Sequence, residues 1–227
     1  LIAAMAMLCC GTVISAANVT NLRCEYRRDP LGIDAARPRL SWVIEADRRG
    51  ERQTAYRILV AATPELLAKD KGDLWDSEMV ASDRSIQVEY AGRPLASRHQ
   101  SFWKVRVWDK EGKPSPWSAP ARWEMGLLAS ADWRAEWIRG SEPEPKSDEA
   151  RFNDQPAPLF RKEFTVERPV ARARAYISGL GYYELRLNGQ RVGDHVLDPG
   201  WTTYSKRVLY STYDVTAHLK EGRNAAG

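Results

Sequence analysis

A short stretch of the sequence carries acidic and aromatic side chains of a kind that can hold a sugar. Asp194 and Asp198 are followed at close spacing by Trp201 and Tyr204. Aromatic rings cover the apolar C–H face of a pyranose, while carboxylates accept hydrogen bonds from its hydroxyl groups. A sugar-contacting loop is therefore one interpretation of these four residues. The other is an ordinary corner of a β-sandwich, in which the same side chains serve only the local structure.

A predicted β-hairpin precedes these residues in the chain. The residues from Tyr183 to Leu187 alternate between apolar and charged side chains, which is the period of a half-buried strand. Asn188-Gly189 then provides the strongest short hairpin signal, because a type I′ turn needs a positive φ at both central residues. The chain leaves the ladder at Gly193 and turns at Asp198-Pro199-Gly200. A rigid hairpin is thus expected to hold the loop with the candidate residues.

The chain from residue 18 to residue 131 is predicted to form one β-sandwich. Its short alternating segments, separated by Pro, Gly and Asp and without amphipathic helices between them, are typical of antiparallel sheets. We expect Trp42 and Trp103 to fill the space between the two sheets. Trp108 and Trp117 fall near a hairpin end, where exposure is the alternative. The expected strands cover residues 40–44, 53–62, 86–90, 102–109 and 115–123, with a helical turn at 64–69 and a turn at 29–32.

A second β domain is expected from residue 159 to residue 227. Its predicted strands, apart from the hairpin, cover residues 159–164, 170–178 and 208–213. These are too few to close a sandwich or jelly roll, which usually needs about eight strands. We therefore expect an incomplete domain in a sequence that is cut at its C-terminal end. Residues 132–158 are predicted to connect the two domains, with a strand or interdomain strap at 132–138 and a Pro-rich linker at 140–158.

Composition and charge narrow the class of partner. The 227 residues include 34 Lys and Arg against 30 Asp and Glu, which gives a net charge of +4 and a pI of about 9.0. Because the two signs are interspersed even in the Arg-rich region 23–52, no sustained basic face is expected, and nucleic-acid binding has little support. The three histidines are scattered along the sequence, so neither a zinc site nor a Cys/His catalytic pair is indicated.

The first 17 residues have the composition of a secretory signal peptide. They are uncharged and largely apolar, and Ser15-Ala16-Ala17 places small residues at the −3 and −1 positions of a signal-peptidase site. They are too few for a comfortable transmembrane span, and an initiator Met and a basic n-region are missing. We expect a truncated signal peptide, 1–17, and an exported protein, periplasmic or extracellular, with no membrane span after cleavage. A buried N-terminal helix is the alternative. Cys24 would then be the only cysteine of the mature chain, which excludes an internal disulfide.

The motifs of this chain resemble the N-terminal portion of bacterial α-L-rhamnosidases, glycoside hydrolase family 78. The resemblance begins at Asn21 and extends through both predicted domains. The last matching stretch is long and specific, whereas PRLSW alone would be weak. The matching stretches are NLRCEYRRDPLGID (21–34), PRLSW (38–42), QTAYRILVA (53–61), LWDSE (74–78), FWKVRVWDKEGKPSPWS (102–118), APLFRKEFTV (157–166) and YISGLGYYELRLNGQRVGDHVLDPGWTTYSKRVLYSTYDVT (176–216).

This resemblance implies an all-β chain, with a fibronectin type III-like sandwich followed by an incomplete β-sandwich or jelly-roll domain. Family enzymes hydrolyse terminal α-L-rhamnosyl linkages with inversion, using a carboxylic acid and a carboxylate base on an (α/α)₆ catalytic barrel. That barrel is absent from this sequence, and no Asp or Glu here matches the catalytic positions. We therefore assign no catalytic residue and expect the fragment to be inactive. The implied partners are rhamnose-containing glycosides or polysaccharides and the catalytic domain of the same full-length chain.

The resemblance also suggests roles for the four candidate residues. Asp194 and Asp198 are expected to be hydroxyl acceptors or calcium ligands, Trp201 a stacking platform and Tyr204 a rim contact. Related rhamnose-binding modules use calcium, although no cofactor is certain and no metal ligand is assigned. In the local-structure alternative, Trp201 packs under the Asp-Pro-Gly turn and both aspartates cap nearby backbone amides. Two other functions stay open: a binding or adhesion module of tandem β-sandwiches without a catalytic partner, and a pair of purely structural domains.

Overall fold

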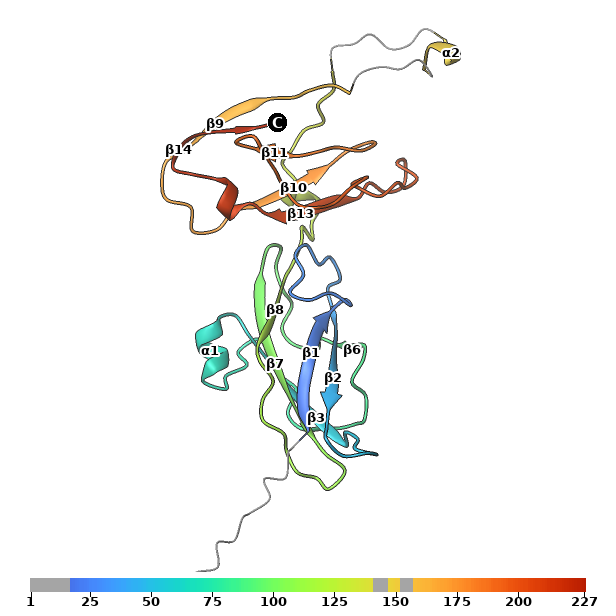
Figure 1. Cartoon of the computed structure of the whole chain (residues 1–227), viewed down its shortest axis with the longest axis vertical. Coiled ribbons are helices and arrows are strands. Elements are labelled where there is room, and N and C mark those ends of the chain that lie inside the picture. The colour runs from blue at the N-terminus through green and yellow to red at the C-terminus, as the bar shows by residue number, and fades with distance from the viewer. Residues whose placement is uncertain (1–16, 141–146, 152–156) are drawn as a thin grey trace, which may run out of the picture. The chain divides into compact units, whose positions relative to one another are not determined.

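The computed structural model describes residues 17–140, 147–151 and 157–227 (Figure 1). They form two compact units, one ending at Leu128 and the other beginning at Ala129. As predicted, the described residues are nearly all in strands and loops, and their helices are three to five residues long. The expected signal peptide, apart from Ala17, and most of the expected linker lie outside the described residues. None of the described helices is long and apolar enough to span a membrane.

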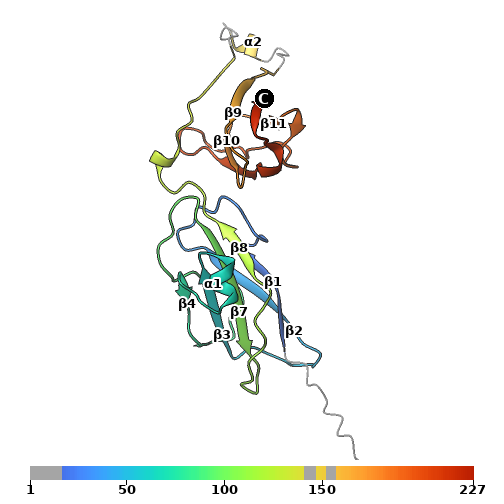
Figure 2. The same cartoon turned by 90° about the vertical axis from the view of Figure 1, so that its left-hand side faces the viewer.

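The first unit is a sandwich of two antiparallel sheets (Figures 1 and 2). One sheet has the strand order β1-β2-β6, and the other has the order β4-β3-β7-β8 with β5 also paired to β3. The longest ladder joins β3 to β7, from Ala55 opposite Trp108 to Ala61 opposite Phe102. The predicted sandwich is therefore confirmed. Its strands are β1 (Asn18–Cys24), β2 (Arg39–Glu45), β3 (Ala55–Ala61), β4 (Trp75–Asp76), β5 (Val80–Ala81), β6 (Val88–Glu89), β7 (Gln100–Trp108) and β8 (Ala121–Glu124).

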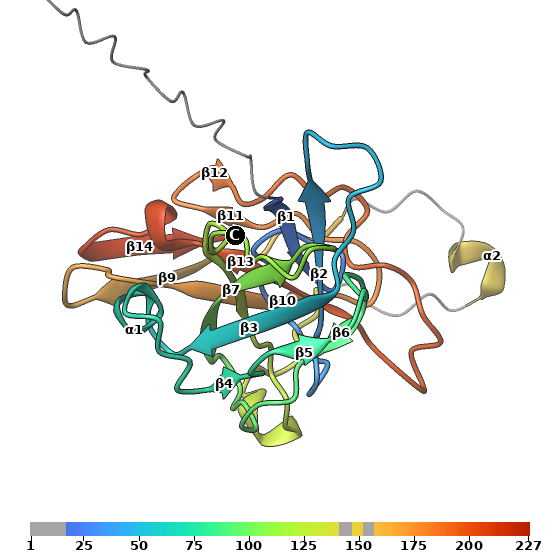
Figure 3. The same cartoon turned by 90° about the horizontal axis from the view of Figure 1, so that it is seen from below.

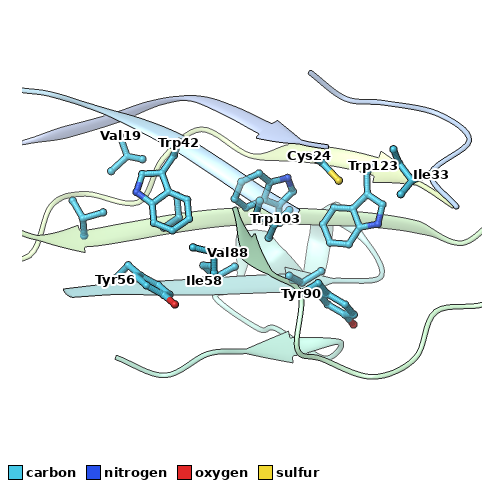
Figure 4. Packing of buried hydrophobic residues seen from close by; sticks show 14 of the residues in the cluster. Val19, Cys24, Ile33, Trp42, Tyr56, Ile58, Val88, Tyr90, Trp103 and Trp123 are labelled. Atoms are coloured by element: carbon cyan, nitrogen blue, oxygen red, sulfur yellow. The ribbon is translucent and has the colours of Figure 1, made fainter. Parts of the chain in front are cut away.

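Three tryptophans fill the space between these sheets (Figure 4). Trp42, Trp103 and Trp123 are at most 2% exposed, which confirms the prediction for the first two. Tyr56 packs edge-on against Trp42 and Tyr90 against Trp123, with ring centroids 5.3 and 5.7 Å apart. Burying such large rings removes much apolar surface from water, so this aromatic layer is a main source of the stability of the first unit.

A buried glutamine connects the aromatic layer to the surrounding backbone. The Trp42 indole Nε1 donates a hydrogen bond to Gln53 Oε1 at 3.0 Å. The Gln53 Nε2 group donates to the carbonyl oxygens of Ser82 and Arg84 at 2.9 and 3.0 Å. Gln53 is only 3% exposed, so its amide is satisfied entirely within the protein. Without this glutamine the indole N–H and both carbonyls would lose their partner.

The outer face of the second sheet is also covered. The helix α1 (Pro64–Ala68) lies near the C-terminal end of β3, as Figure 3 shows, and matches the predicted helical turn. Thr63 caps this helix, because its Oγ1 accepts a hydrogen bond from the Leu66 amide. Leu67 of α1 and Leu59 of β3 belong to one buried cluster and are at most 2% exposed. As a result β3 is buried on both faces.

Two serines replace part of the expected last strand of the first unit. β8 is shorter than the predicted strand at 115–123, because prolines at positions 114, 116 and 120 cannot donate to a ladder. The Oγ atoms of Ser115 and Ser118 instead accept hydrogen bonds from the amides of Val107 and Val105, at 3.2 and 3.1 Å. The two serines therefore satisfy the β7 amides at these two positions.

The half-buried tryptophans belong to the outside of the sandwich. Trp108 and Trp117 are neither core residues nor fully exposed. The Trp117 ring lies 4.5 Å from the Arg106 guanidinium carbon and 5.0 Å from Lys104 Nζ. Lys104 is itself 8% exposed and is paired with Asp70. Cation–π contact and the ion pair together explain how a lysine is accommodated at this depth.

The second unit also contains two antiparallel sheets, with the orders β12-β11-β14-β9 and β10-β13. They enclose a small core of Leu187, Val192, Tyr213 and Val215. This sandwich-like arrangement confirms the predicted fold class of the second domain. The strands are β9 (Lys162–Val166), β10 (Arg174–Ser178), β11 (Arg186–Leu187), β12 (Gln190–Arg191), β13 (Tyr210–Asp214) and β14 (Gly222–Ala226).

The hairpin is where the sequence places it, but one neighbouring strand is not predicted. Asn188 and Gly189 have φ values of 51° and 81° and join β11 to β12, as a type I′ turn requires. β14 is formed by Gly, Arg, Asn and Ala, which have little β-propensity. It pairs along its whole length with β9, from Gly222 opposite Val166 to Ala226 opposite Lys162. Tertiary pairing therefore decides the conformation of this segment.

Of the two alternatives for residues 132–138, the strand is not observed. The 3₁₀ helix η1 (Ser130–Asp132) is followed by residues 133–140, which the structure describes without helix or strand. The Trp133 ring contacts the Tyr210 ring at a centroid distance of 5.5 Å, whereas Trp137 is 61% exposed. Trp133 thus packs against β13, and contact with a ring from another part of the chain sets its position.

We expect Gln53→Ala to lower the free energy of unfolding of the first unit by about 1–3 kcal/mol, because it leaves buried polar groups without partners. Urea unfolding of the full chain, followed by the fluorescence of the buried tryptophans, measures this loss. The double variant with Trp42→Phe should lose less than the sum of the single variants, since the indole donor has then also been removed. Strict additivity would contradict a contribution from the Trp42–Gln53 hydrogen bond.

Candidate functional site

Asp198 is the most highly connected side chain in the candidate loop. Its Oδ2 accepts hydrogen bonds from the Tyr183 and Tyr213 hydroxyls, both at 2.6 Å. The Tyr183 amide also donates to the Asp198 carbonyl oxygen at 3.0 Å. One aspartate therefore joins the segment that precedes the hairpin strand β11, the loop after β12 and the strand β13. Its side chain is 16% exposed and points into the unit.

The hydrogen bonds fix the charge state of this carboxylate. Burial by itself would raise the pKa of Asp198, but hydrogen bonds from Ser211, Tyr183 and Tyr213 and the nearby His195 hold that pKa below its usual range. The tyrosines respond in the opposite direction. Burial and the hydrogen bond to Asp198 raise the pKa of Tyr183 and of Tyr213. Near neutral pH the cluster is thus a carboxylate held by neutral phenols.

Tyr213 also fixes the first half of the loop. Its ring lies so close to Gly193 that a Cβ at this glycine would stand 2.5 Å from Tyr213 Cε1. Gly193 has a φ of +73°, so the position needs glycine for both its conformation and its packing. The imidazole Nδ1 of His195 lies 3.2 Å from the Tyr213 hydroxyl and 3.5 Å from Asp198 Oδ1. Tyr213 thus contacts the loop at Gly193, His195 and Asp198.

Trp201 has the opposite orientation and faces solvent. It is 72% exposed, and its ring is stacked on the ring of Tyr182 at a centroid distance of 5.9 Å and an angle of 16°. Tyr204 stabilises the Tyr182 segment, since its hydroxyl accepts a hydrogen bond from the Gly181 amide at 3.0 Å. We call the exposed pair Tyr182 and Trp201 the aromatic platform. It is held between two segments that are distant in sequence.

The four predicted site residues therefore have different environments. Trp201 is exposed, as a stacking platform must be, and Asp194 is exposed where the chain enters the loop. The Tyr204 hydroxyl is engaged with the backbone, and Asp198 is engaged with two tyrosines. The structure brings Trp201 and Tyr204 into one assembly through residues 181 and 182, while Asp198 anchors the loop from inside.

Sequence reasoning missed the partners that organise this site. Tyr182 could have been found, because the alternation that turns Tyr183 inward turns its neighbour outward. The sequence has no comparable signal for His195 or Tyr213. The side chain of Tyr213 meets that of Asp198, 15 positions earlier in the sequence, only because β13 lies next to the loop.

Exposed aliphatic residues occur in the same segments of the chain as the platform. Leu180, Val196 and Leu197 are 59%, 74% and 68% exposed, and Leu209 is 39% exposed. Leu197 also has a φ of 54°, an unfavourable conformation for a leucine, and it directly precedes the anchored Asp198. Apolar exposure at this density is typical of a surface that contacts another molecule or another domain.

The part of the chain that the structure describes contains no metal-binding cluster, and a pocket in its first unit has its polar groups already engaged. Within residues 17–140, 147–151 and 157–227, no three His, Cys, Asp or Glu side chains come together in a way that could hold a metal ion. An open pocket of about 300 Å³ in the first unit is lined by β1 and residues 119–121. Its polar groups are engaged within the protein, because Arg28 donates to Asn21 and Asp29 accepts from the Arg122 amide.

Comparison with known proteins matches both units to one family of glycosidases. Residues 19–129 match the model of a Rha78A-like, N-terminal immunoglobulin domain, and residues 168–227 match the alpha-L-rhamnosidase N-terminal domain. The chain belongs to the α-L-rhamnosidase family and corresponds to the N-terminal region of its members. The match confirms the resemblance seen in the sequence. An immunoglobulin-type and a fibronectin type III-type domain share the two-sheet sandwich observed for the first unit.

Curated relatives carry the same name. The chain is 39% identical over 216 residues to an α-L-rhamnosidase of Formosa agariphila, covering 88% of this chain and 23% of that protein. It is 28% identical to an α-L-rhamnosidase of Streptomyces avermitilis, covering 93% of this chain and 36% of the relative. The chain thus spans about a quarter to a third of the length of these relatives.

Solved structures agree with this membership. The structure of the α-L-rhamnosidase from Dictyoglumus thermophilum matches 92% of this chain and 24% of that chain, with a TM-score of 0.82 and 38% identity. The Streptomyces avermitilis α-L-rhamnosidase complexed with L-rhamnose matches 93% of this chain and 21% of that chain, with a TM-score of 0.53 and 33% identity. The similarity to these rhamnosidases spans both units.

We expect Asp198→Ala to destabilise the second unit by about 1.5–3 kcal/mol, the usual contribution of hydrogen bonds to a charged group. Hydrogen exchange of the β13 amides in the full chain measures the loss.

Because the folded-state pKa of Asp198 lies below the unfolded value of about 3.9, the stabilisation is complete above that pH and disappears as the pH falls through the folded-state pKa. Asp198→Asn should remove this acid-dependent component, and an unchanged acid profile in Asp198→Asn would contradict the anchor.

Proposed function

We propose that this chain is the non-catalytic, N-terminal accessory part of an exported, inverting α-L-rhamnosidase. The observation that carries the proposal is the identity of 39% to a protein named alpha-L-rhamnosidase, matched over 88% of this chain but only 23% of that protein. The substrates are terminal α-L-rhamnose residues on glycosides or polysaccharides, and the partner is the catalytic domain of the same full-length chain. Export, to the periplasm or beyond, is supported by the signal-like sequence of residues 1–17.

The aromatic platform is the part of the second unit that we assign to rhamnose. Trp201 and Tyr182 present nearly parallel, exposed rings, and such faces suit the apolar side of a pyranose. Asp194, exposed at the start of the loop, is the hydroxyl acceptor of this proposal, and Tyr204 supports the rim. Asp198 acts from below by positioning the loop, since its Oδ2 already accepts two hydroxyl groups. Calcium is not needed for these contacts.

A second candidate role for the same surface is packing against another domain of a longer rhamnosidase. The specific observation in its favour is the exposure of aliphatic side chains in the same loop, since Val196 and Leu197 are 74% and 68% exposed. Aliphatic side chains contribute less to sugar recognition than aromatic rings do, but they are common at the apolar centre of protein interfaces. The two roles predict different consequences for free rhamnose binding, which the experiment on Trp201 separates.

The chain itself is expected to release no rhamnose from an aryl α-L-rhamnoside, because hydrolysis requires a paired acid and base that we assign to the catalytic domain. A colorimetric assay at high protein concentration measures this. Turnover that disappears on substitution of a single carboxylate of this chain would overturn the accessory role.

Trp201→Ala is expected to weaken the binding of L-rhamnose to the full chain by about 1–3 kcal/mol, the scale of a lost aromatic contact. Isothermal calorimetry measures the affinity. Trp137→Ala is the matched control, since Trp137 is a 61% exposed tryptophan of the same unit outside the platform. Equal affinities for the wild type and Trp201→Ala would remove the platform from sugar recognition and favour the packing role.

A further inference from the structure

The hairpin turn of the second unit contains a dipeptide with its own chemistry. Asn188-Gly189 is the only Asn-Gly pair in the sequence. In a flexible Asn-Gly segment, the backbone nitrogen of glycine can attack the side-chain amide carbon of asparagine, because glycine has no side chain to hinder the approach. The N–C bond that forms closes a succinimide, and the Cγ–Nδ2 bond breaks with loss of ammonia. Water then opens the ring to aspartate or isoaspartate.

The folded hairpin holds the Asn188 amide away from this reaction. Its Nδ2 donates to the His218 carbonyl oxygen and to Asn224 Oδ1, both at 2.9 Å. Its Oδ1 accepts a hydrogen bond from the Ala225 amide at 2.9 Å. To reach the Gly189 nitrogen, the Asn188 side chain must rotate and give up these three hydrogen bonds.

The partner asparagine is itself firmly placed. Asn224 lies in β14, is 3% exposed, and donates from Nδ2 to the carbonyl oxygens of Lys220 and Gly222 at 2.7 and 2.9 Å. Its Oδ1 also accepts from the Lys220 amide at 3.0 Å. The acceptor that receives the Asn188 amide is therefore fixed by β14 and the turn before it, and the hairpin binds to a rigid surface.

The backbone contacts that connect the hairpin to this surface are separate from the ladder between β14 and β9. β11 meets β14 at one paired position, Leu187 opposite Ala226. The Asn188 amide donates to the Ala225 carbonyl at 2.8 Å, and Arg186 and Gly227 exchange two hydrogen bonds at 2.7 and 2.9 Å. β9, by contrast, pairs with β14 at five positions. Local opening between β11 and β14 therefore breaks these contacts while the ladder between β14 and β9 stays intact.

We propose that Asn188 is a latent deamidation site that is closed while the hairpin is docked on β14 and reactive when the two separate. Once Asn188 is modified, the docked state of the hairpin is also not recovered. Aspartate at this position turns a donating group into a carboxylate that faces two acceptors, the His218 carbonyl and Asn224 Oδ1, and so repels them. Isoaspartate adds a methylene to the main chain of a two-residue turn, which changes the register of β11 and β12. Either product prevents the hairpin from docking again.

Incubation of the full chain at mildly alkaline pH, with and without urea, tests the proposal. Peptide mass spectrometry measures deamidation at Asn188, with Asn21, which precedes leucine, as the internal control. We expect modification of Asn188 in the folded chain to be at least about tenfold slower than in urea, which corresponds to an opening free energy of at least about 1.4 kcal/mol. Equal rates in the folded and unfolded chain would overturn the proposal.

Asn224→Ala tests the protection of Asn188 directly, because it removes the side chain that accepts a hydrogen bond from the Asn188 amide. Deamidation in the folded variant should be several-fold faster than in the wild type. An unchanged rate, in a variant whose β14 and hairpin amides exchange faster with solvent, would overturn the role of this contact. If the variant does not fold, graded sub-denaturing urea replaces it in the wild-type chain. The rate at Asn188 should then rise in step with exchange of the hairpin amides, and a rate that does not follow this exchange would also overturn the proposal.

Discussion

The second unit depends on one carboxylate with two phenolic hydrogen bonds. Asp198 Oδ2 accepts from Tyr183 and Tyr213, which belong to segments that approach each other only in the folded chain. This unit has a small buried core, so polar contacts with good geometry contribute a larger share of its stability than they do in a large domain. The same contact keeps the loop in a conformation that places Leu197 at a positive φ and leaves Trp201 exposed.

The first unit follows a different design. Three buried tryptophans provide its apolar layer, and the indole N–H of one of them, Trp42, has a dedicated partner in Gln53. The serines at 115 and 118 satisfy amides of β7 where prolines interrupt the ladder. A domain built in this way is well suited to be a stable scaffold. The exposed aromatic and aliphatic side chains that suit contact with a sugar or a protein surface instead gather in the second unit.

Much of the fold could be read from the sequence because it depends on local chemistry. Alternation of apolar residues gave β7 and β10, the Asn188-Gly189 pair gave the hairpin, and the tryptophan positions gave the core of the first unit. The errors have equally physical causes. β14 has almost no β-propensity and forms by pairing with β9, whereas the strand alternative for residues 132–138 is not realised, because this segment pairs with no strand of the described residues.

The sequence by itself determined the all-β class, the hairpin that carries the candidate loop and the membership in the rhamnosidase family, because periodicity, turn chemistry and long motifs are local properties of the chain. Only the tertiary structure decided that Asp198 points inward and Trp201 outward, and that Tyr182 completes the platform. The physical reason is that the orientation of a loop side chain is set by its partners. Those partners, Tyr213 above all, come from strands that the loop meets only after folding.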